Sequence, residues 1–187
     1  NIKVTTDVGK TGVIGDINYN KNGPCIALRA DMDALTIQET SNLSYKSIND
    51  GIMHACGHDG HIAMLLGVAE ILSQKKDLLK GRVRFIFQPA EEGAGGARFM
   101  IKDGCLKGVD EIYGAHLWNY QKTGTIGIQT GPVMAAADLF KIIIRGKGGH
   151  GAAPQGCVDA VMVASHLIQS FQTIISRNTN PIDSTVI

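Results

Sequence analysis

The chain has 187 residues, of which 44% are hydrophobic and 19% are charged, so its composition is that of a globular protein and excludes intrinsic disorder. The formal net charge is +1 and no basic patch is interleaved with aromatic residues, so the sequence does not point to nucleic acid. No apolar run approaches the roughly 20 residues of a membrane-spanning helix. The four cysteines are far apart and form no CxxC pair, which fits reduced thiols in the cytoplasm.

The first predicted elements are two strands joined by a turn. Residues 12–17 form a short strand, and residues 18–24 form a turn rich in Asn and Gly. Residues 25–30 are mostly apolar, which is typical of a central strand in a covered sheet. Asp31 and Asp33 follow this strand at its C-terminal end, where open α/β sheets bind their ligands.

A dense cluster of metal-competent side chains comes next. Cys56 and His58 stand at i and i+2, which on an extended segment directs both side chains to one side. A thiolate and an imidazole held that way form half of a zinc-like site. Residues 62–72 predict a largely buried helix that Asp59 or Gly60 can cap. A helix N-terminus lowers the pKa of a nearby thiol, so we expect Cys56 to be a thiolate.

Two adjacent carboxylates follow the next predicted strand. Residues 81–88 form this strand, and Pro89 stops it because proline cannot donate to the ladder. Glu91 and Glu92 come directly after. Two neighbouring carboxylates repel each other unless a cation or a proton separates them.

A helix and a third strand complete this pattern. Residues 97–102 begin the helix, with Gly104 as its C-cap, and residues 110–117 form a strand with His116 near its end. The alternation of strands and helices predicts an α/β fold with a mostly parallel sheet covered by helices. In such a sheet, the aspartates, the glutamates and the histidine that follow successive strands lie at one edge.

The pattern changes near residue 137, where we expect a second domain to start. Residues 138–145 predict a strand, and residues 146–154 form a glycine-rich loop that contains His150. Residues 158–176 have helical periodicity. The chain opens without an initiator Met and ends on an apparent strand start, so we expect a piece of a longer polypeptide.

Cysteine, histidine and glutamate side chains together can hold one or two divalent ions. Thiolate and imidazole ligands favour Zn, Co, Ni or Mn over Mg or Ca. Two ions about 3.5–4 Å apart could activate water and polarise a carbonyl group. In the Glu91–Glu92 pair, one carboxylate can bind metal while its neighbour serves as general base.

Four ordered motifs resemble the M20 family of metallopeptidases, and most closely its amidohydrolase subfamily. That branch includes hippurate hydrolase, N-acyl-amino-acid amidohydrolases, auxin-conjugate hydrolases and N-acetyldiaminopimelate deacetylase. The motifs are residues 29–35 (RADMDAL), 53–59 (MHACGHD), 87–93 (FQPAEEG) and 146–151 (GKGGHG). The resemblance implies a partial metal-dependent catalytic domain of phosphorylase/hydrolase-like fold at residues 1–136 and a partial α+β lid or dimerisation domain at residues 137–187.

The resemblance also implies a reaction, a ligand set and an assembly. Cys56 resembles the ligand that bridges two metal ions, and His58, Glu92 and His116 resemble the other ligands. The implied enzyme is a homodimer, joined through the lid domain, that hydrolyses the amide bond of N-acyl amino acids or small amide conjugates.

Further residues resemble the family's catalytic groups. Glu91 resembles the general base that takes a proton from metal-bound water. Asp33 resembles the carboxylate that orients a ligand, with Asp31 beside it in a less defined role. His150 resembles a lid-domain histidine that stabilises the oxyanion.

The sequence also departs from the family pattern. Thr36 stands where the family often has proline. The family's last metal-binding histidine follows the lid domain and has no counterpart here, so we expect the isolated 187-residue piece to be inactive.

Two other readings compete with the hydrolase. A metal- or peptide-binding relative could keep the fold without turnover, although Glu91 argues against it because a binding protein needs no base beside a ligand. A phosphate-binding role for residues 146–151 is weak, since no Walker Lys-Ser/Thr pair and no ribose-binding acid accompany the glycines.

Overall fold

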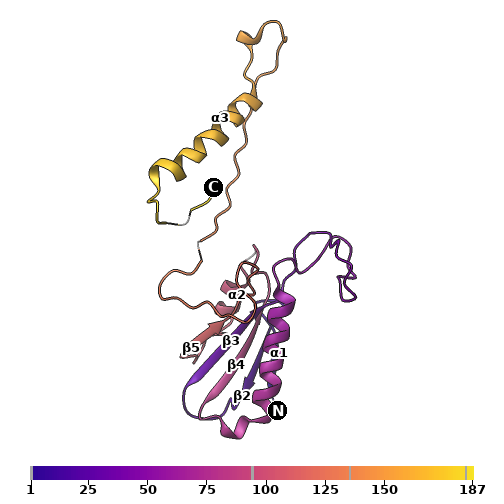
Figure 1. Ribbon diagram of the computed structural model, residues 1–187, viewed down its shortest axis with the longest axis vertical. Helices are drawn as coiled ribbons and strands as arrows, with labels where there is room; N and C mark the ends of the chain where they lie inside the picture. Colours follow the sequence, from indigo (N-terminus) through magenta and orange to yellow (C-terminus); the bar gives the residue numbers. More distant parts are fainter. Residues whose placement is uncertain (1, 94, 135, 184) are drawn as a thin grey trace. The chain divides into compact units, whose positions relative to one another are not determined.

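The computed structural model describes residues 2–93, 95–134, 136–183 and 185–187. They fall into two compact units, Asn1–Lys122 and Thr123–Ile187, and each is described by itself (Figure 1). The expected boundary at residues 136 and 137 lies inside the second unit. The assignment of catalytic and lid domains stays a prediction.

A five-stranded sheet forms the centre of the first unit, with strand order β1-β2-β4-β3-β5. The strands are β1 (Lys3–Val8), β2 (Gly12–Ile17), β3 (Cys25–Asp31), β4 (Arg82–Gln88) and β5 (Glu111–Gly114). β3 runs parallel to its neighbours β4 and β5, whereas β2 runs antiparallel to β1 and β4.

The predicted α/β class is confirmed, but the sheet is mixed and not mostly parallel. The connections that lead into β2 and β3 are short turns, whereas a parallel crossover needs about a dozen residues or more. Alternation of strand and helix, on which the prediction depended, holds only for β3, β4 and β5. These three strands are the parallel part of the sheet.

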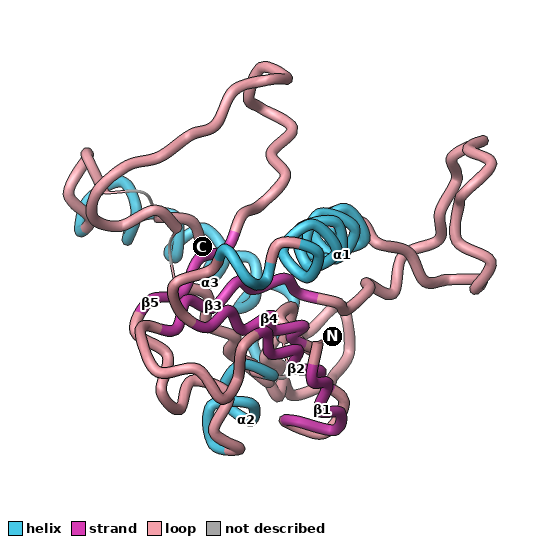
Figure 2. The backbone as a smooth tube through the Cα atoms, turned by 90° about the horizontal axis from the view of Figure 1, so that it is seen from below, coloured by secondary structure: helices cyan, strands magenta, loops and turns pink. Residues whose placement is uncertain are grey.

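Helices cover both faces of this sheet, α1 on one and α2 on the other (Figure 2). The helical segments are α1 (His58–Gln74), the 3₁₀ turn η1 (Lys76–Leu78), α2 (Gly96–Lys102), the 3₁₀ turn η2 (Pro154–Gly156), α3 (Ala160–Thr173) and the π-helical turn η3 (Ile174–Asn178). Leu65 of α1 packs in a cluster with Phe85, and Met100 of α2 packs in a second cluster with Ile86. Neighbouring residues of β4 point to opposite faces of the sheet, so this strand contributes side chains to both clusters. Among the described residues, no helix is long and apolar enough to cross a membrane.

Helix α1 differs from the prediction at its start and in its burial. It begins at His58, and its N-cap is Gly57 with φ 81°, so Asp59 and Gly60 are not the cap. Glycine suits this position because a left-handed conformation strains other residues. Only one stripe of α1 is buried, since a helix that lies on a single sheet touches it along one face; that stripe is His58, His61, Leu65 and Ala69.

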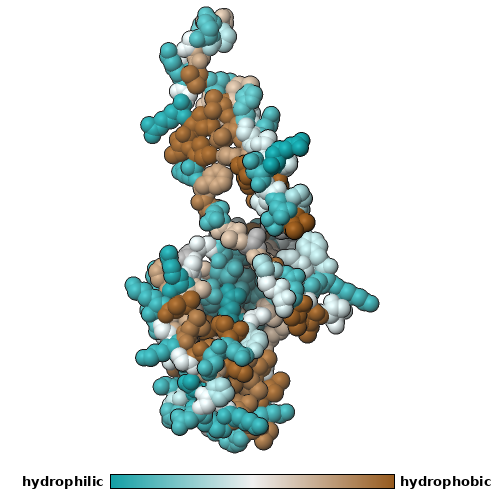
Figure 3. Space-filling model, turned by 90° about the vertical axis from the view of Figure 1, so that its left-hand side faces the viewer, coloured by the Kyte–Doolittle hydropathy of each residue, from teal (hydrophilic) through white to brown (hydrophobic). Residues whose placement is uncertain are grey.

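Apolar side chains outside these clusters remain exposed on the first unit. Figure 3 looks at the molecule from the β5 side and shows patches of hydrophobic side chains there. Ile112 and Tyr113 of β5 are about half exposed, as are Leu66 and Ile71 of α1. Among the described residues, β5 pairs only with β3, so it is an edge strand.

The second unit contains α3 but not the predicted strand. Residues 138–145 form no strand because a strand needs a ladder partner, and no described segment pairs with them. Helix α3 lies within the predicted range 158–176, and the Asp159 side chain caps it by accepting hydrogen bonds from the N–H groups of Val161 and Met162. The glycine-rich loop is closed by an isolated bridge between Lys147 and Val158.

Candidate metal centre

The C-terminal ends of three parallel strands carry the polar residues that the sequence singled out. Asp31 ends β3, Glu91 follows β4, and His116 follows β5. Because β3 lies between β4 and β5 in one parallel register, the three ends meet at the same edge of the sheet. The start of α1 brings His58 to this edge.

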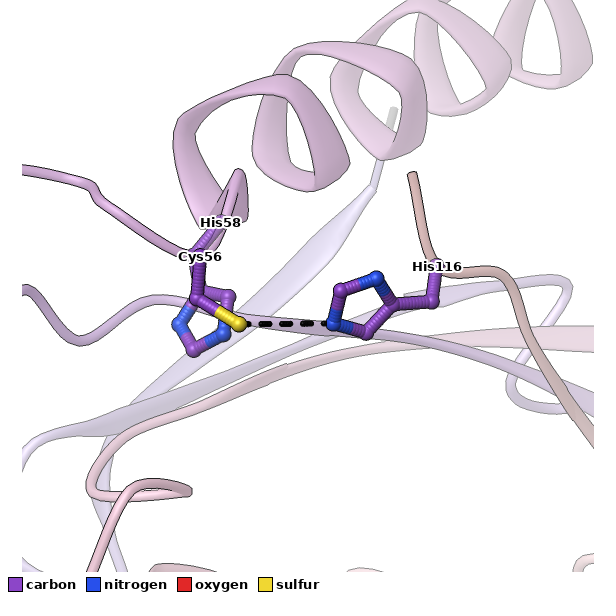
Figure 4. A group of neighbouring side chains, drawn as sticks. All are labelled: Cys56, His58 and His116. Atoms are coloured by element: carbon purple, nitrogen blue, oxygen red, sulfur yellow. Dashed lines mark hydrogen bonds between the residues drawn. The ribbon is translucent and has the colours of Figure 1, made fainter. Parts of the chain in front are cut away.

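Cys56, His58 and His116 come together there although His116 is remote in sequence (Figure 4). One ligand atom from each lies within 4.8 Å of the others. Cys56 Sγ is 3.5 Å from His116 Nε2. The Nδ1 atom of His116 bonds to the carbonyl oxygen of Leu117, so that nitrogen carries the proton and Nε2 presents a lone pair toward the thiol.

His58 is buried and has one ring nitrogen without a partner. Its Nδ1 donates to the carbonyl oxygen of Asp33 at 2.9 Å. Its Nε2 is enclosed and has no hydrogen-bond partner among the described residues. The nearest charged atoms are carboxylate oxygens of Asp31 at 3.7 Å and Glu92 at 3.8 Å. A lone pair that faces two carboxylates is repelled by both, and a cation would satisfy all three groups.

Both glutamates belong to the same site. His58, Glu91 and Glu92 form a second group whose ligand atoms lie within 4.8 Å of one another. Ala90, directly before them, has φ 52°, a conformation that costs a non-glycine residue energy and often marks functional turns. The structure therefore brings together all four predicted ligands and the predicted base.

The environment of Cys56 opposes the thiolate that the helix start alone suggested. Burial, a hydrogen bond to Glu92 and the negative charges of Glu92, Glu91 and Asp31 raise the pKa of the Cys56 thiol to about 11. The expected thiolate is therefore wrong for the protein without a bound cation, because the carboxylates outweigh the helix N-terminus. Binding a divalent ion reverses this balance, since a coordinating thiol is deprotonated.

Asp33 orients its neighbours mainly through its main chain and one carboxylate oxygen. Its carbonyl oxygen accepts from His58, as above, and lies 3.2 Å from His54 Nδ1. Its Oδ2 accepts a hydrogen bond from the main-chain N–H of Glu92 at 2.9 Å. Burial raises the pKa of Asp33, but hydrogen bonds from the main chain of Glu92 and Glu91 lower it overall. Asp33 thus tethers the segment that carries both glutamates.

Behind the site lies a buried network to which the sequence motif assigned no function. Asp31 accepts hydrogen bonds from Arg29 Nη1 at 2.8 Å and from His61 Nδ1 at 2.6 Å. Burial raises the pKa of Asp31, but the hydrogen bond from His61 and the charge of Arg29 bring it below its usual value. The sequence contained one indication that His61 belongs to this site. His61 stands three residues after His58, and on a helix that spacing places both side chains on the same face.

His150 lies in the second unit, on the glycine-rich loop. Its Nδ1 accepts a hydrogen bond from the N–H of Ala152 at 3.1 Å, so in the neutral ring Nε2 carries the proton and can donate it. Together with Cys157 and the loop glycines, His150 lines an open hollow of about 490 Å³.

The donor set suits a divalent transition metal. Thiolate and imidazole select ions such as Zn²⁺ over Mg²⁺, and the unpartnered His58 Nε2 is the buried atom that such an ion would satisfy. His58 belongs to three groups of ligand-competent side chains, which also contain Cys56 and His116, Glu91 and Glu92, and Asp31 and His61.

Comparison with known proteins gives a consistent picture. The family model for peptidase family M20/M25/M40 matches residues 27–185. An N-acetyl-L-cysteine deacetylase of Bacillus subtilis is 50% identical over 186 residues, which is 100% of this chain and 45% of the deacetylase. An N-acyl-L-amino acid amidohydrolase of Geobacillus stearothermophilus is 48% identical over 179 residues, which is 95% of this chain and 48% of that enzyme. The chain thus spans about half the length of the curated relatives it matches.

A solved structure shares the fold. The YXEP protein of Bacillus subtilis, described as a dinuclear metal binding peptidase from the M20 family, aligns with a TM-score of 0.66 and 52% identity. The alignment covers 70% of this chain and 37% of that one.

Proposed function

Because the chain belongs to peptidase family M20/M25/M40, we propose that the protein is a metal-dependent amidohydrolase that cleaves N-acyl amino acids or small amide conjugates. The observation that carries this proposal is the cluster at the edge of the sheet, where the buried His58 Nε2 lies near a thiol and carboxylates and has no hydrogen-bond partner in the described part of the chain. The names of the deacetylase and amidohydrolase relatives support amide hydrolysis as the reaction class.

Cys56, His58, Glu92 and His116 are the residues that would hold the metal. The description of the YXEP protein as a dinuclear metal binding peptidase supports a site for two ions, and zinc, manganese, cobalt and nickel would all suit these ligands. When bound, the ions would polarise the amide carbonyl and make water more acidic.

Glu91 is proposed as the general base. It stands next to Glu92 on a strained turn, within the same group of ligand-competent atoms. In that position its carboxylate can accept a proton from the attacking water and pass it to the leaving amine. The main-chain hydrogen bond from Glu92 to Asp33 holds this turn, which keeps the base in register with the ligands.

His150 is proposed to stabilise the oxyanion of the tetrahedral intermediate. Its Nε2 is the ring nitrogen that can donate, because Nδ1 accepts from Ala152. It sits on an exposed, glycine-rich loop, which is a poor place for a core histidine. A positioned donor at the oxyanion is worth about 2.7–4 kcal/mol.

A homodimer is part of the proposal. Helix α3 has no buried side chain among the described residues, and Val161 and Ile168 on it are 76% and 63% exposed. An apolar helix face of this kind supports association through the second unit. The four cysteines are free, which supports a reducing compartment such as the cytoplasm.

Metal analysis combined with a hydrolysis screen on the full-length protein tests this proposal. N-acetyl, N-benzoyl and diaminopimelate conjugates sample the substrate class. We expect one or two equivalents of transition metal and amide hydrolysis that a chelator abolishes and added metal restores. Bound metal without hydrolysis of any conjugate would favour a binding protein, and hydrolysis that survives complete metal removal would refute the proposal.

A further inference from the structure

His61 is a buried histidine of α1 whose two ring nitrogens are both engaged. Its Nε2 accepts a hydrogen bond from the main-chain N–H of Leu117 at 2.9 Å. A ring nitrogen that accepts carries no proton, so the proton lies on Nδ1, which faces Asp31 Oδ1 at 2.6 Å. His61 therefore has no lone pair left for a metal ion, although its atoms lie close to Asp31 and His58.

The Asp31 carboxylate, at the inner end of this series of hydrogen bonds, is held firmly in place. Asp31 ends β3, is 1% exposed and also accepts from Arg29 Nη1 at 2.8 Å. Arg29 Nε donates in turn to Gln88 Oε1 at 2.9 Å, and Gln88 ends β4. Two neighbouring strands of the sheet thus fix the carboxylate, and charge-assisted hydrogen bonds in a buried setting hold it firmly.

The outer end of this series of hydrogen bonds lies in the loop after β5. β5 ends at Gly114, so His116 and Leu117 lie beyond the ladder hydrogen bonds. The Leu117 side chain rests on the start of α1, where a Cβ on Gly60 would lie 2.5 Å from it. The rings of His61 and His116 meet edge to face, with centroids 4.6 Å apart. The hydrogen bond to His61 is thus made by the peptide group next to a candidate ligand.

We propose that His61 is a positioning residue, which uses the buried Asp31 carboxylate to hold the main chain beside His116 and so fixes that ligand before an ion arrives. The inference rests on the proposed function, because the position of His116 matters only if the cluster binds metal. Outer partners of metal ligands typically contribute about 10–100-fold to metal affinity.

Three substitutions in the full-length protein separate the two hydrogen bonds. His61→Gln keeps an acceptor near the position of Nε2, and His61→Asn keeps a donor near that of Nδ1. His61→Phe removes both and keeps the ring volume. Each protein is stripped of metal and titrated with Co²⁺, followed by calorimetry and by the thiolate-to-cobalt absorption of Cys56.

The Phe and Asn variants are expected to bind one of two cobalt ions about 10–100-fold more weakly than the wild type, while the Gln variant recovers most of that loss. The other ion should bind with nearly unchanged affinity. Melting temperatures of the metal-free proteins provide the control, because a purely structural role lowers stability and affinity in parallel in all three variants.

The proposal is overturned if all variants bind cobalt with equal affinity. It is also overturned if the loss of cobalt affinity follows the melting temperature and the Gln variant shows no recovery. If the Phe variant does not fold, the comparison of Gln with Asn decides, and equal affinities in those two overturn it. A wild-type protein that binds no cobalt refutes the proposed function itself, which keeps the two failures distinct.

Discussion

The two ring nitrogens of His58 differ in whether they have a hydrogen-bond partner. Nδ1 is satisfied by the Asp33 carbonyl, whereas Nε2 is enclosed without a hydrogen-bond partner among the described residues. Leaving a buried polar group unsatisfied costs about 1–3 kcal/mol. The site therefore holds an energetic cost in the metal-free protein that a cation at Nε2 would remove.

The division of roles between the two glutamates can be tested by isosteric substitution. In the full-length protein, Glu91→Gln should reduce kcat by about 10²–10⁴-fold, the usual contribution of a general base, with metal content unchanged. Glu92→Gln should lower metal content, because an amide is a weaker ligand than a carboxylate. Metal analysis and steady-state kinetics on both variants provide the check. Loss of metal from the Glu91→Gln protein, together with full activity of the Glu92→Gln protein, would reverse the assignment.

The raised pKa of Cys56 makes metal binding dependent on pH. Below a pKa of about 11 the metal-free Cys56 is a neutral thiol, so binding as a thiolate releases one proton. Metal affinity should therefore rise about tenfold per pH unit. Between about pH 9.5 and 10.5 this slope is informative, because an ordinary thiol is already largely ionised there and an ordinary histidine is neutral.

Calorimetric titrations in buffers of different ionisation enthalpy measure the released protons directly. Cys157→Ser, in the second unit, should behave as the wild type, whereas Cys56→Ser should lose the proton release. An affinity that is flat across that pH window would mean that Cys56 does not bind as a thiolate.

At the scale of elements, the turn between β4 and α2 sets the positions of both glutamates. The N–H of Gly96 donates to the carbonyl oxygen of Ala90 at 3.0 Å and closes the turn. Gly96 is buried, and a Cβ there would overlap the carbonyl oxygen of Pro89. Gly93 lies in the same turn, is exposed and has open space around it.

Gly96→Ala should therefore destabilise the full-length protein by about 1–3 kcal/mol, the usual cost of overpacking, and lower its metal content. Gly93→Ala should leave both nearly unchanged. Chemical denaturation and metal analysis measure the two effects. Equal behaviour of the two alanine variants would show that this turn is not the support of the glutamates.

Elements with strong local patterns could be predicted from the sequence. The predicted strands at residues 25–30 and 81–88 correspond to β3 and β4, and the predicted helix at residues 62–72 lies within α1. β3 and β4 are neighbours in the sheet, so the residues that follow them lie at one edge, as the sequence predicted. β1 was not predicted, because five of its six residues are exposed and carry no burial pattern. The strand at residues 138–145 was predicted wrongly, since a strand is defined by a partner that the local sequence does not contain.

Long-range electrostatics were the part of the site that the sequence could not predict. The start of α1 suggested a thiolate at Cys56, but Glu91 and Glu92 approach it from β4 and raise its pKa instead. The role of His61 depends likewise on Leu117, which is distant in the chain. Spacing along the sequence identifies candidate ligands, whereas their protonation and their supports come from tertiary contacts.

At the scale of the whole molecule, the two units are proposed to act together across a dimer. His150 belongs to the second unit and the metal ligands to the first. Full-length His150→Ala should bind metal normally but lose most of its kcat, about 10²–10³-fold for one oxyanion donor. Mixed with Glu91→Ala subunits, it should recover part of the activity, because one site then receives an intact base from one chain and an intact histidine from the other.

Native mass spectrometry verifies that mixed dimers form, and each variant mixed with itself is the control. No recovery in verified mixed dimers would mean that His150 acts within its own subunit or not at all.

Anomalous diffraction from crystals of the full-length protein loaded with zinc tests the central claim most directly, that Cys56, His58, Glu92 and His116 form a metal centre. Peaks at the zinc edge should lie about 2.3 Å from Cys56 Sγ and about 2.0–2.1 Å from the Nε2 atoms of His58 and His116. A carboxylate oxygen of Glu92 should complete the coordination. The absence of a peak between these side chains, or a peak only at other residues, would contradict the claim.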